Sequence, residues 1–483
     1  MNDELHADLD VGETISRARK AQSQWAQRSV GTRLRILPEL RFALADEVDE
    51  IVPEIKAIRA VSDAEILSTE ILPFFAACQF LEKHAQRILA TRRLSAGGRP
   101  KWLGPARSRV ERSPWGVVLI LAPANYPFFL AATQAIQALV AGNAVLLKPA
   151  PNCSGPANFL AALCQRAGFP SALLQILPEN VQMAESAIDA GVDKIHLTGG
   201  GETGRQVLTR AASPLTPATM ELSGMDAMIV RADADPKRVA QALSYGLSVN
   251  KGETCIAPRR VYVHCDAYPK LLELLAESLK ARAFQEGLPE MLHAAIDNAL
   301  QAGAKTVFGQ LDSENPQLPI LLHEVPLDSP LWLSEHFAAV SAMKVVESDE
   351  QALEHLAESG FALGVSIFSE DVDAANRLQR AIVAGVITIN DVIVPTADPR
   401  LPFGGRQSSG FGVTRGEEGL LDLTTPRVVI ERTSKSWAPH FELEHPTDSQ
   451  LFLGFVRIGH SRRLSERIRG LIATAKLIIQ RGP

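Results

Sequence analysis

A cysteine and a glutamate, each close to a glycine, are the residues of this chain best suited to covalent chemistry. Cys255 lies in the segment Lys-Gly-Glu-Thr-Cys-Ile-Ala-Pro, and Glu221 precedes it by 34 residues in the segment Met-Glu-Leu-Ser-Gly. A thiolate is a strong nucleophile, and a carboxylate can serve as a general base. Because the chain also carries a glycine-rich loop, the three features together suggest oxidation or acyl transfer through a thioester.

The glycine-rich loop fits the G-x-G-x-x-G template of dinucleotide-binding turns. It includes Gly199, Gly200 and Gly204, and it lies between a predicted strand and a predicted helix. Such glycines let the backbone approach a pyrophosphate at the positive end of the helix. In the usual version an acidic residue about 20 positions further on holds the ribose. Glu221 is 22 residues after Gly199, so a ribose-binding role competes with the catalytic one.

Apolar segments alternate with helical patterns after residue 115, whereas residues 13–90 are expected to be helical. Alternation of this kind predicts parallel sheets that are covered by helices on both faces. The fold class is therefore α/β, with a doubly wound nucleotide-binding domain and a second α/β domain, and Cys255 lies near their junction. The predicted strands are 116–121, 144–147, 174–177 and 194–198 in the first half, and 228–230, 260–263, 341–346, 365–368 and 386–389 in the second.

Composition narrows the class of protein. The chain has 483 residues, of which 46% are hydrophobic and 22% charged, and a net charge of −6, which argues against nucleic acid as a partner. Its five cysteines include no C-x-x-C pair, so neither a disulfide framework nor a zinc site is predicted. No signal peptide can be read at the N-terminus, and we expect a reducing, cytoplasmic location.

Eight short motifs follow one another in the order found in one enzyme family. They are Ala122-Pro123-Ala124-Asn125-Tyr126-Pro127-Phe128, Leu147-Lys148-Pro149, Leu197-Thr198-Gly199, Glu221-Leu222-Ser223-Gly224, Gly252-Glu253-Thr254-Cys255, Glu335-His336-Phe337, Asn390-Asp391-Val392-Ile393-Val394 and Pro402-Phe403-Gly404-Gly405. In this order they resemble the aldehyde dehydrogenases, and most closely the shorter class 3 type. The resemblance extends from about Ala18 to Leu423.

The resemblance implies roles for three catalytic residues. Cys255 would attack the aldehyde carbon, and a thioester would remain after oxidation. The side-chain amide of Asn125 and the backbone N–H of Cys255 would stabilise the oxyanion. Glu221 would activate the water that hydrolyses the thioester. Its Met-Glu-Leu-Ser-Gly setting matches the base motif of the family, which favours this role over ribose binding.

The resemblance also implies a nicotinamide cofactor and the residues that hold it. Gly199, Gly200 and Gly204 would form the phosphate turn, and Lys148 would bind the adenine ribose. Glu335 would bind the nicotinamide ribose, and Phe337 would pack near the ring. NAD and NADP both remain open, because Pro151 occupies a position where the family often has a glutamate that repels a 2′-phosphate.

The implied domain arrangement is a cofactor domain over 1–223, with bridging strands near 95–112, and a catalytic domain over 224–395. Residues 396–432 would return to the cofactor domain and add a bridging strand, and the bridging element would support a homodimer. Residues 433–483 exceed the family core. They contain apolar residues on one helical face, from Leu464 to Ile479, among several arginines. Such a helix can lie on an anionic membrane surface, but packing on its own subunit or on a partner is slightly favoured.

Several departures leave two other functions open. Ala338-Ala339 replaces a Gly-Pro turn, Glu253 replaces a glutamine beside the nucleophile, and the helix-rich stretch 284–322 is short for the family. One alternative is a CoA-acylating or reductive member of the superfamily, in which another acceptor resolves the thioester. The other is a catalytically weak scaffold of the same fold. An apolar aldehyde is the expected substrate of the main hypothesis.

Overall fold

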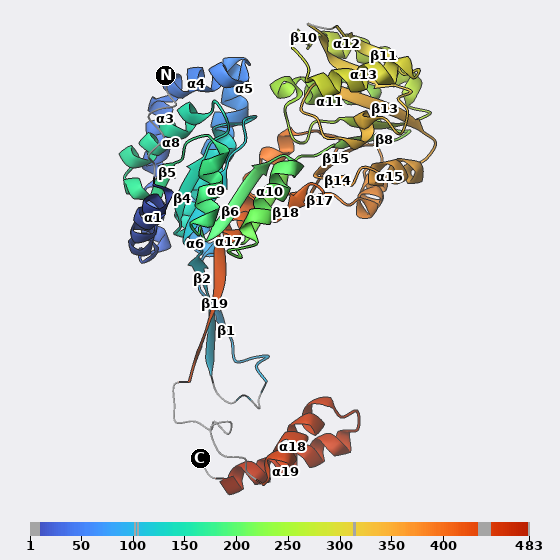
Figure 1. Ribbon diagram of the computed structural model, residues 1–483. Coiled ribbons are helices and arrows are strands. Elements are labelled where there is room, and N and C mark those ends of the chain that lie inside the picture. The colour runs from blue at the N-terminus through green and yellow to red at the C-terminus, as the bar shows by residue number, and fades with distance from the viewer. Residues whose placement is uncertain (1–9, 101–102, 104–105, 313–314, 433–445, 482–483) are drawn as a thin grey trace. The chain divides into compact units, whose positions relative to one another are not determined.

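The computed structural model describes residues 10–100, 103, 106–312, 315–432 and 446–481, and the chain divides into two compact units (Figure 1). The first unit comprises residues 1–88 and 114–425, and the second comprises 89–113 and 426–483. Both sheets of the first unit have helices between successive parallel strands, so the predicted α/β fold class is confirmed. The domain limits given above stay a prediction.

The first unit begins with helices, as predicted for residues 13–90. They are α1 (Val11–Ala26), α2 (Val30–Leu34), α3 (Leu37–Asp46), α4 (Val48–Arg59), α5 (Asp63–Ile66), the π-helical turn η2 (Leu67–Ile71) and α6 (Leu72–Ile88). Among the described residues, the continuous stretch 63–88 alone is long and apolar enough to span a membrane. Half of its apolar window is buried inside the structure. A mostly buried core helix passes the same length and composition test.

A six-stranded sheet forms the nucleotide-binding half of this unit. Its order is β18-β7-β6-β3-β4-β5, and all neighbouring strands are parallel except β18 and β7. The strands are β3 (Val117–Leu121), β4 (Ala144–Lys148), β5 (Leu174–Ile176), β6 (Lys194–Gly199), β7 (Ala218–Leu222) and β18 (Gly410–Phe411). The connecting helices are α7 (Phe129–Ala141), α8 (Ser154–Ala167), η4 (Ser171–Leu173), α9 (Val181–Asp189) and α10 (Gly201–Ala211).

The chain order of these strands creates a switch point between β3 and β6. From β3 the chain moves outward to β4 and β5, then returns to the other side of β3 to form β6 and β7. Ligands of doubly wound sheets bind beyond the carboxyl ends of the strands at such a point. The loops after β3, β6 and β7 carry Asn125, Gly200 and Ser223, respectively, and Glu221 is close to the end of β7.

An eight-stranded sheet forms the other half of this unit, in the order β10-β12-β13-β9-β8-β15-β16, with β11 beside β12. Its strands are β8 (Ala227–Val230), β9 (Arg260–His264), β10 (Phe284–Gln285), β11 (Lys305–Gln310), β12 (Gln317–His323), β13 (Val340–Val346), β15 (Gly364–Phe368) and β16 (Val386–Ile389). The expectation of a helix-rich stretch at 284–322 is only partly right, because α13 (Glu290–Gln301) is followed by β11 and β12. The apolar side chains of β12 are buried in the core of this sheet, which favours a strand there.

The remaining elements of the first unit lie along the chain between these strands or next to them. They are α11 (Pro236–Ser248), η5 (Val249–Gly252), α12 (Tyr268–Lys280), α14 (Pro330–Leu333), α15 (Asp349–Ala357), β14 (Phe361–Ala362), α16 (Val372–Leu378), η6 (Gln379–Ala381), η7 (Val394–Ala397), β17 (Arg406–Gln407) and α17 (Gly416–Asp422).

The second unit contains a three-stranded sheet in the order β1-β2-β19. Its strands are β1 (Arg92–Leu94), β2 (Arg107–Pro114) and β19 (Thr424–Glu431), so the bridging strands predicted near 95–112 and within 396–432 share one sheet. The unit also contains two helices, α18 (Asp448–His460) and α19 (Leu464–Arg481), which pack against each other.

Candidate active site

A tight bend of the backbone presents Cys255. The bend follows α11, where Asn250, Lys251 and Gly252 have positive φ angles of 50°, 53° and 81° in succession. A Cβ at Gly252 would lie 2.6 Å from the carbonyl carbon of Ala338, so only glycine fits there. The alanines that replace the Gly-Pro turn are thus packed against the loop of the nucleophile, and both are buried.

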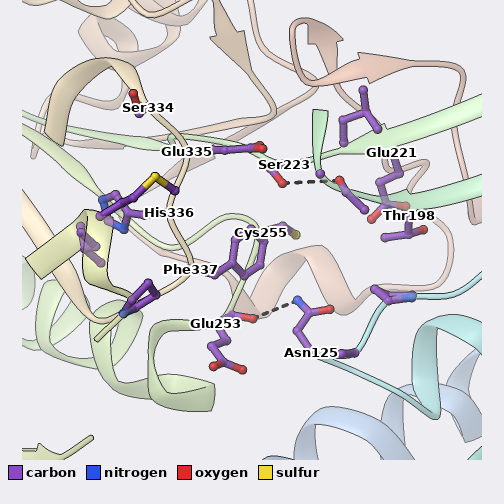
Figure 2. Close-up of a pocket in the computed structure, with 18 of the residues that line it drawn as sticks. Asn125, Thr198, Glu221, Ser223, Glu253, Cys255, Ser334, Glu335, His336 and Phe337 are labelled. Atoms are coloured by element: carbon purple, nitrogen blue, oxygen red, sulfur yellow. Dashed lines mark hydrogen bonds between the residues drawn. The ribbon is translucent and has the colours of Figure 1, made fainter. Parts of the chain in front are cut away.

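Two cavities meet at Cys255. One has a volume of about 870 Å³ and extends past Asn125, Gly200 and Glu335 (Figure 2). The other has a volume of about 190 Å³ and is lined largely by apolar side chains. They share Cys255 and Glu221 in their linings. A group bound in one cavity and a group bound in the other would therefore meet at the thiol.

Glu221 lies near the end of β7 and is 4% exposed. Its Oε2 accepts a hydrogen bond of 3.0 Å from the hydroxyl of Thr414. Burial raises the pKa of the Glu221 carboxyl, while the nearby Arg415 and the Thr414 hydrogen bond act in the opposite direction. A carboxyl with a raised pKa is better matched to proton transfer near neutral pH than a surface glutamate. The structure thus brings Glu221 to Cys255, and its assignment as the base stays a prediction.

Asn125 lies in the loop between β3 and α7. Its Nδ2 donates to the carbonyl of Glu253 at 2.9 Å, which ties this loop to the loop of Cys255 (Figure 2). An amide nitrogen has two N–H groups, so one hydrogen bond leaves a second donor. The Glu253 side chain is exposed and points away from Cys255. Its carboxylate is therefore not placed to disfavour the Cys255 thiolate by charge repulsion.

A buried ion pair, which no sequence motif indicated, supports both loops. Arg59 and Glu70 are 3.1 Å apart, and Glu70 also accepts hydrogen bonds from the backbone N–H groups of Phe128 and Phe129, at 3.0 and 2.7 Å. The Nε of Arg59 donates to the side chain of Asn250 at 2.7 Å. Every oxygen of the Glu70 carboxylate thus has a partner, as a buried charge requires.

Asn250 connects this ion pair to the two loops of the site. Its Nδ2 donates to the carbonyl of Asn125 at 2.8 Å and to that of Glu253 at 3.2 Å. The side chain of Asn250 therefore joins the oxyanion loop to the nucleophile loop. Its position inside a Val-Asn-Lys-Gly segment was the available signal, because asparagine tolerates a positive φ better than most residues.

Arg415 is a second functional candidate that the sequence did not indicate. It lines the smaller cavity, is 7% exposed, and donates from Nη1 to the carbonyl of Thr396 at 2.8 Å. Its guanidinium carbon lies 4.4 Å from the ring centroid of Phe403, and its Nε has no hydrogen-bond partner among the described residues. A buried cation with a free donor is costly unless an anion is near.

The anionic forms of both reactive residues benefit from this cation. Burial and the carboxyls of Glu221 and Asp226 raise the pKa of the Cys255 thiol, whereas Arg415 and Arg259 lower it. Arg415 also lowers the pKa of Glu221. The guanidinium of Arg415 thus favours both the thiolate and the carboxylate.

The larger cavity contains most of the predicted cofactor-binding residues. Gly199, Gly200, Glu335 and Phe337 line it. Gly200 is the N-cap of α10, and Glu335 accepts from the backbone N–H of Gly201 at 3.3 Å. Gly204 lies one turn into α10, where a Cβ would approach Leu222 to 2.9 Å, so it serves close packing of helix on strand rather than contact with the cavity.

Lys148 does not line this cavity; it lies at the end of β4. Its Nζ donates to the carbonyls of Pro149 and Glu179, each at 2.8 Å. The Glu179 carboxylate in turn accepts hydrogen bonds from the backbone N–H groups of Asn152, at 2.7 Å, and Ser154, at 2.8 Å. Asn152 lies just before α8, and Ser154 is its first residue. A carboxylate thus lies near the positive end of this helix, a role that the sequence did not suggest for Glu179.

The residues present fit a dinucleotide. The glycine turn and the N-terminus of α10 form one wall of the larger cavity, and backbone N–H groups at such an end favour phosphate. The cavity volume lies within the usual range for cofactor sites, roughly 300–1,000 Å³. Cys265, by contrast, lies just after β9 beside His264 and lines neither of the two cavities.

Comparison with known proteins reveals the family. A family model described as the aldehyde dehydrogenase family matches residues 4–429. A 4,4′-diapolycopene aldehyde oxidase from Methylomonas sp is 32% identical over 447 residues, covering 89% of this chain and 84% of that protein. A 4,4′-diaponeurosporen-aldehyde dehydrogenase from Staphylococcus aureus is 26% identical over 420 residues, covering 84% of this chain and 91% of that protein.

Solved structures share the fold. An NADP-dependent glyceraldehyde-3-phosphate dehydrogenase from Bacillus halodurans C-125, complexed with NADP, superposes with a TM-score of 0.81 at 26% identity, covering 88% of this chain and 91% of that one. A Mycobacterium tuberculosis aldehyde dehydrogenase complexed with NAD+ gives a TM-score of 0.79 at 24% identity, covering 89% and 91%. Together with the family match over most of the sequence, these findings show that the chain belongs to the aldehyde dehydrogenase family.

Proposed function

We propose that this enzyme oxidises an apolar aldehyde to the carboxylic acid through a thioester on Cys255, which water then hydrolyses. The observation that carries the proposal is that Cys255 and Glu221 lie together where an apolar cavity meets the glycine-lined cavity. The aldehyde would enter from the apolar side and the cofactor from the other. Both would then reach the same sulfur atom.

The residues of the chain would act in a defined order. The Cys255 thiolate attacks the carbonyl carbon, and the oxyanion accepts hydrogen bonds from the Asn125 amide and the Cys255 N–H. A nicotinamide dinucleotide, when bound, supplies the two-electron oxidation that leaves a thioester. Glu221 then takes a proton from water, the resulting hydroxide attacks the thioester carbon, and the C–S bond breaks to release the acid and the thiolate.

NAD or NADP is the cofactor that we propose, since relatives of this fold bind one or the other. The glycine turn at 199–201 would hold the pyrophosphate, Glu335 the nicotinamide ribose, and Phe337 would pack near the ring. Lys148, away from this cavity, would contact the adenine ribose. The assignment to the class 3 type stays a prediction on the sequence motifs.

The apolar character of the substrate rests on the smaller cavity. Its lining includes Phe129, Leu130, Ile256, Ile393 and Phe403. Two of the relatives are named for aldehydes of 4,4′-diapolycopene and 4,4′-diaponeurosporene. Hydrocarbon aldehydes of different chain lengths, including those two, are therefore the first substrates to test.

The test is formation of the reduced nicotinamide by the purified full-length protein, with each aldehyde and with NAD and NADP in turn. We expect turnover that Cys255→Ser abolishes and Cys265→Ser leaves unchanged. No turnover with any aldehyde, from a folded protein that binds nucleotide, would contradict the proposal and favour the scaffold. Faster product formation with CoA than with water, as an acyl-CoA, would favour the acylating alternative.

We also propose a homodimer formed through the three-stranded sheet of the second unit, in a cytoplasmic enzyme. Strand β19 is at one edge of that sheet and exposes Val428 and Ile430, which suits pairing with another chain. Sedimentation velocity of the intact protein tests the dimer, and Val428→Lys should convert it to a monomer. A monomeric parent protein would contradict this arrangement.

A further inference from the structure

The two C-terminal helices form a hairpin with a narrow seam. Leu451 and Gly454 of α18 and Gly470 and Thr474 of α19 are the buried residues of this pair. A Cβ at Gly470 would lie 3.0 Å from the carbonyl oxygen of Gly454, so the two glycines let the helices cross closely. Small residues form most of this seam, and most large apolar side chains of the two helices lie outside it.

The large apolar side chains of the hairpin are exposed instead. On α19 they recur at intervals of one, three, four and six residues, and Ile479 is 78% exposed. At about 100° per residue, they occupy one sector of the helix, roughly 120° wide. They are Leu464, Ile468, Leu471, Ile472, Ile478 and Ile479 on α19, with Phe452, Leu453 and Val456 on α18. On α18 the exposed apolar side chains lie on the side of the helix away from the seam, so the continuous apolar face is the sector of α19.

Basic residues border this apolar face. On the wheel of α19, Arg467 lies at one edge of the apolar sector, and Lys476 and Arg469 lie at the other. The segment 447–483 contains seven arginines and lysines and two acidic residues, a net charge of +5. The whole chain has a net charge of −6, so the other residues carry −11. The positive charge is thus concentrated beside the exposed apolar face.

We propose that the hairpin α18–α19 is a docking element for an anionic lipid surface. The apolar sector would enter the boundary between headgroups and acyl chains, and the flanking arginines and lysine would lie among the anionic headgroups. The charge pattern favours lipid over pairing with the hairpin of a second copy, because two such hairpins would bring +5 against +5. The inference goes beyond the proposed oxidation and does not depend on it.

Sedimentation of the full-length protein with vesicles tests this docking, without substrate or cofactor. Phosphatidylcholine vesicles with and without phosphatidylglycerol are compared at low and high salt. We expect the protein to sediment with the anionic vesicles, and high salt to release part of it because salt screens the charges. Circular dichroism of every variant checks that the helices remain.

Three variants separate the contributions. Ile468→Gln combined with Leu471→Gln and Ile472→Gln should abolish vesicle binding. Arg469→Gln combined with Lys476→Gln should weaken binding to anionic vesicles by about fivefold for each charge, or roughly thirtyfold together. Ala473→Gln, which is exposed outside the apolar sector, is the matched control and should bind like the parent protein.

Two results would overturn the proposal. One is a protein that fails to sediment with anionic vesicles, or binds them equally well with the triple glutamine substitution. The other is a triple variant that changes from dimer to monomer, because the apolar face would then belong to a second copy of the chain. Oxidation of a short soluble aldehyde should be unchanged in the triple variant, so failure of docking and failure of the proposed activity are distinguishable.

Discussion

The hydroxyl of Thr414 donates to the Glu221 carboxylate at 3.0 Å, although the two residues are 193 positions apart. The contact connects β7 to the loop before α17, which also carries Arg415. One loop thus supplies a hydrogen-bond donor and a positive charge to the carboxylate. The protonation of Glu221 is therefore set by residues outside its own motif.

Thr414→Val should make deacylation more dependent on high pH. The hydrogen bond lowers the pKa of Glu221, so its loss raises that pKa, and the carboxylate fraction falls on the acid side. We expect a decrease of up to roughly tenfold near neutral pH, with recovery as the pH rises. The measurement is the pH profile of kcat. Thr414→Ser keeps the hydroxyl and should have the pH profile of the parent protein. An unchanged profile in Thr414→Val would contradict a role of the hydroxyl in setting the pKa of Glu221.

Glu221→Gln should trap the acyl-enzyme. Removal of the base leaves thiol attack and oxidation intact but slows hydrolysis by roughly 10²–10⁴-fold. A burst of reduced cofactor, equal to the enzyme concentration, should precede slow turnover. Mass spectrometry of the quenched protein should find the acyl group on Cys255. Full turnover without accumulation would exclude Glu221 as the hydrolytic base.

Arg415→Met should shift kcat/KM to higher pH. Arg415 lowers the pKa of both Cys255 and Glu221, so its removal raises both. The reactive anions then form only at higher pH, and activity near neutral pH falls while alkaline activity recovers. An uncharged aldehyde should be used, so that substrate binding does not contribute. Arg415→Lys retains the charge, so its kcat/KM profile should move part of the way back toward that of the parent protein. A uniform loss of kcat/KM at every pH would indicate a structural role alone.

Glu70→Ala should destabilise the protein by about 3 kcal/mol, because it leaves the buried Arg59 with Glu65 as its one carboxylate and removes the acceptor of the Phe128 and Phe129 N–H groups. Urea denaturation measures this loss. We also expect kcat to fall, since Arg59 orients Asn250, which holds both loops of the site. Lys56→Ala removes an exposed ion pair with Asp63 and is the control, with little effect expected on either quantity. Equal stability of Glu70→Ala and the parent would refute the argument.

Glu179→Gln should improve the use of NADP relative to NAD. The hydrogen bonds from Ser154 and Asn152 outweigh the effect of burial and lower the pKa of Glu179, so it is anionic at neutral pH. If Lys148 holds the adenine ribose, this carboxylate repels a 2′-phosphate and takes the place of the glutamate missing at Pro151. The ratio of kcat/KM for NADP to that for NAD should rise at least tenfold.

Glu185→Gln provides the control for this change. Glu185 lies on α9 and pairs with Arg210, so its loss should not alter the choice of cofactor. An unchanged ratio in Glu179→Gln would place the ribose elsewhere.

Local patterns predicted the elements well. The buried strand β3 and the helix α7 are almost entirely apolar, and that composition alone indicates a core position. The glycine turn before α10 was likewise visible, because its spacing follows from local backbone demands. The strand β7 escaped notice, since its five residues Ala-Thr-Met-Glu-Leu show no clear strand pattern.

By itself the sequence determined the family motifs, the order of strands and helices, and the identity of Cys255, Glu221 and Asn125 as candidates. The tertiary structure alone decided which residues surround them. Thr414, Arg415 and Glu70 are each more than 150 residues from Cys255 in the chain, and Asn250, although five residues from it, contacts Asn125 across 125 residues. No local spacing encodes such contacts. Their electrostatic effect depends on distance and burial, which exist only once the chain has folded.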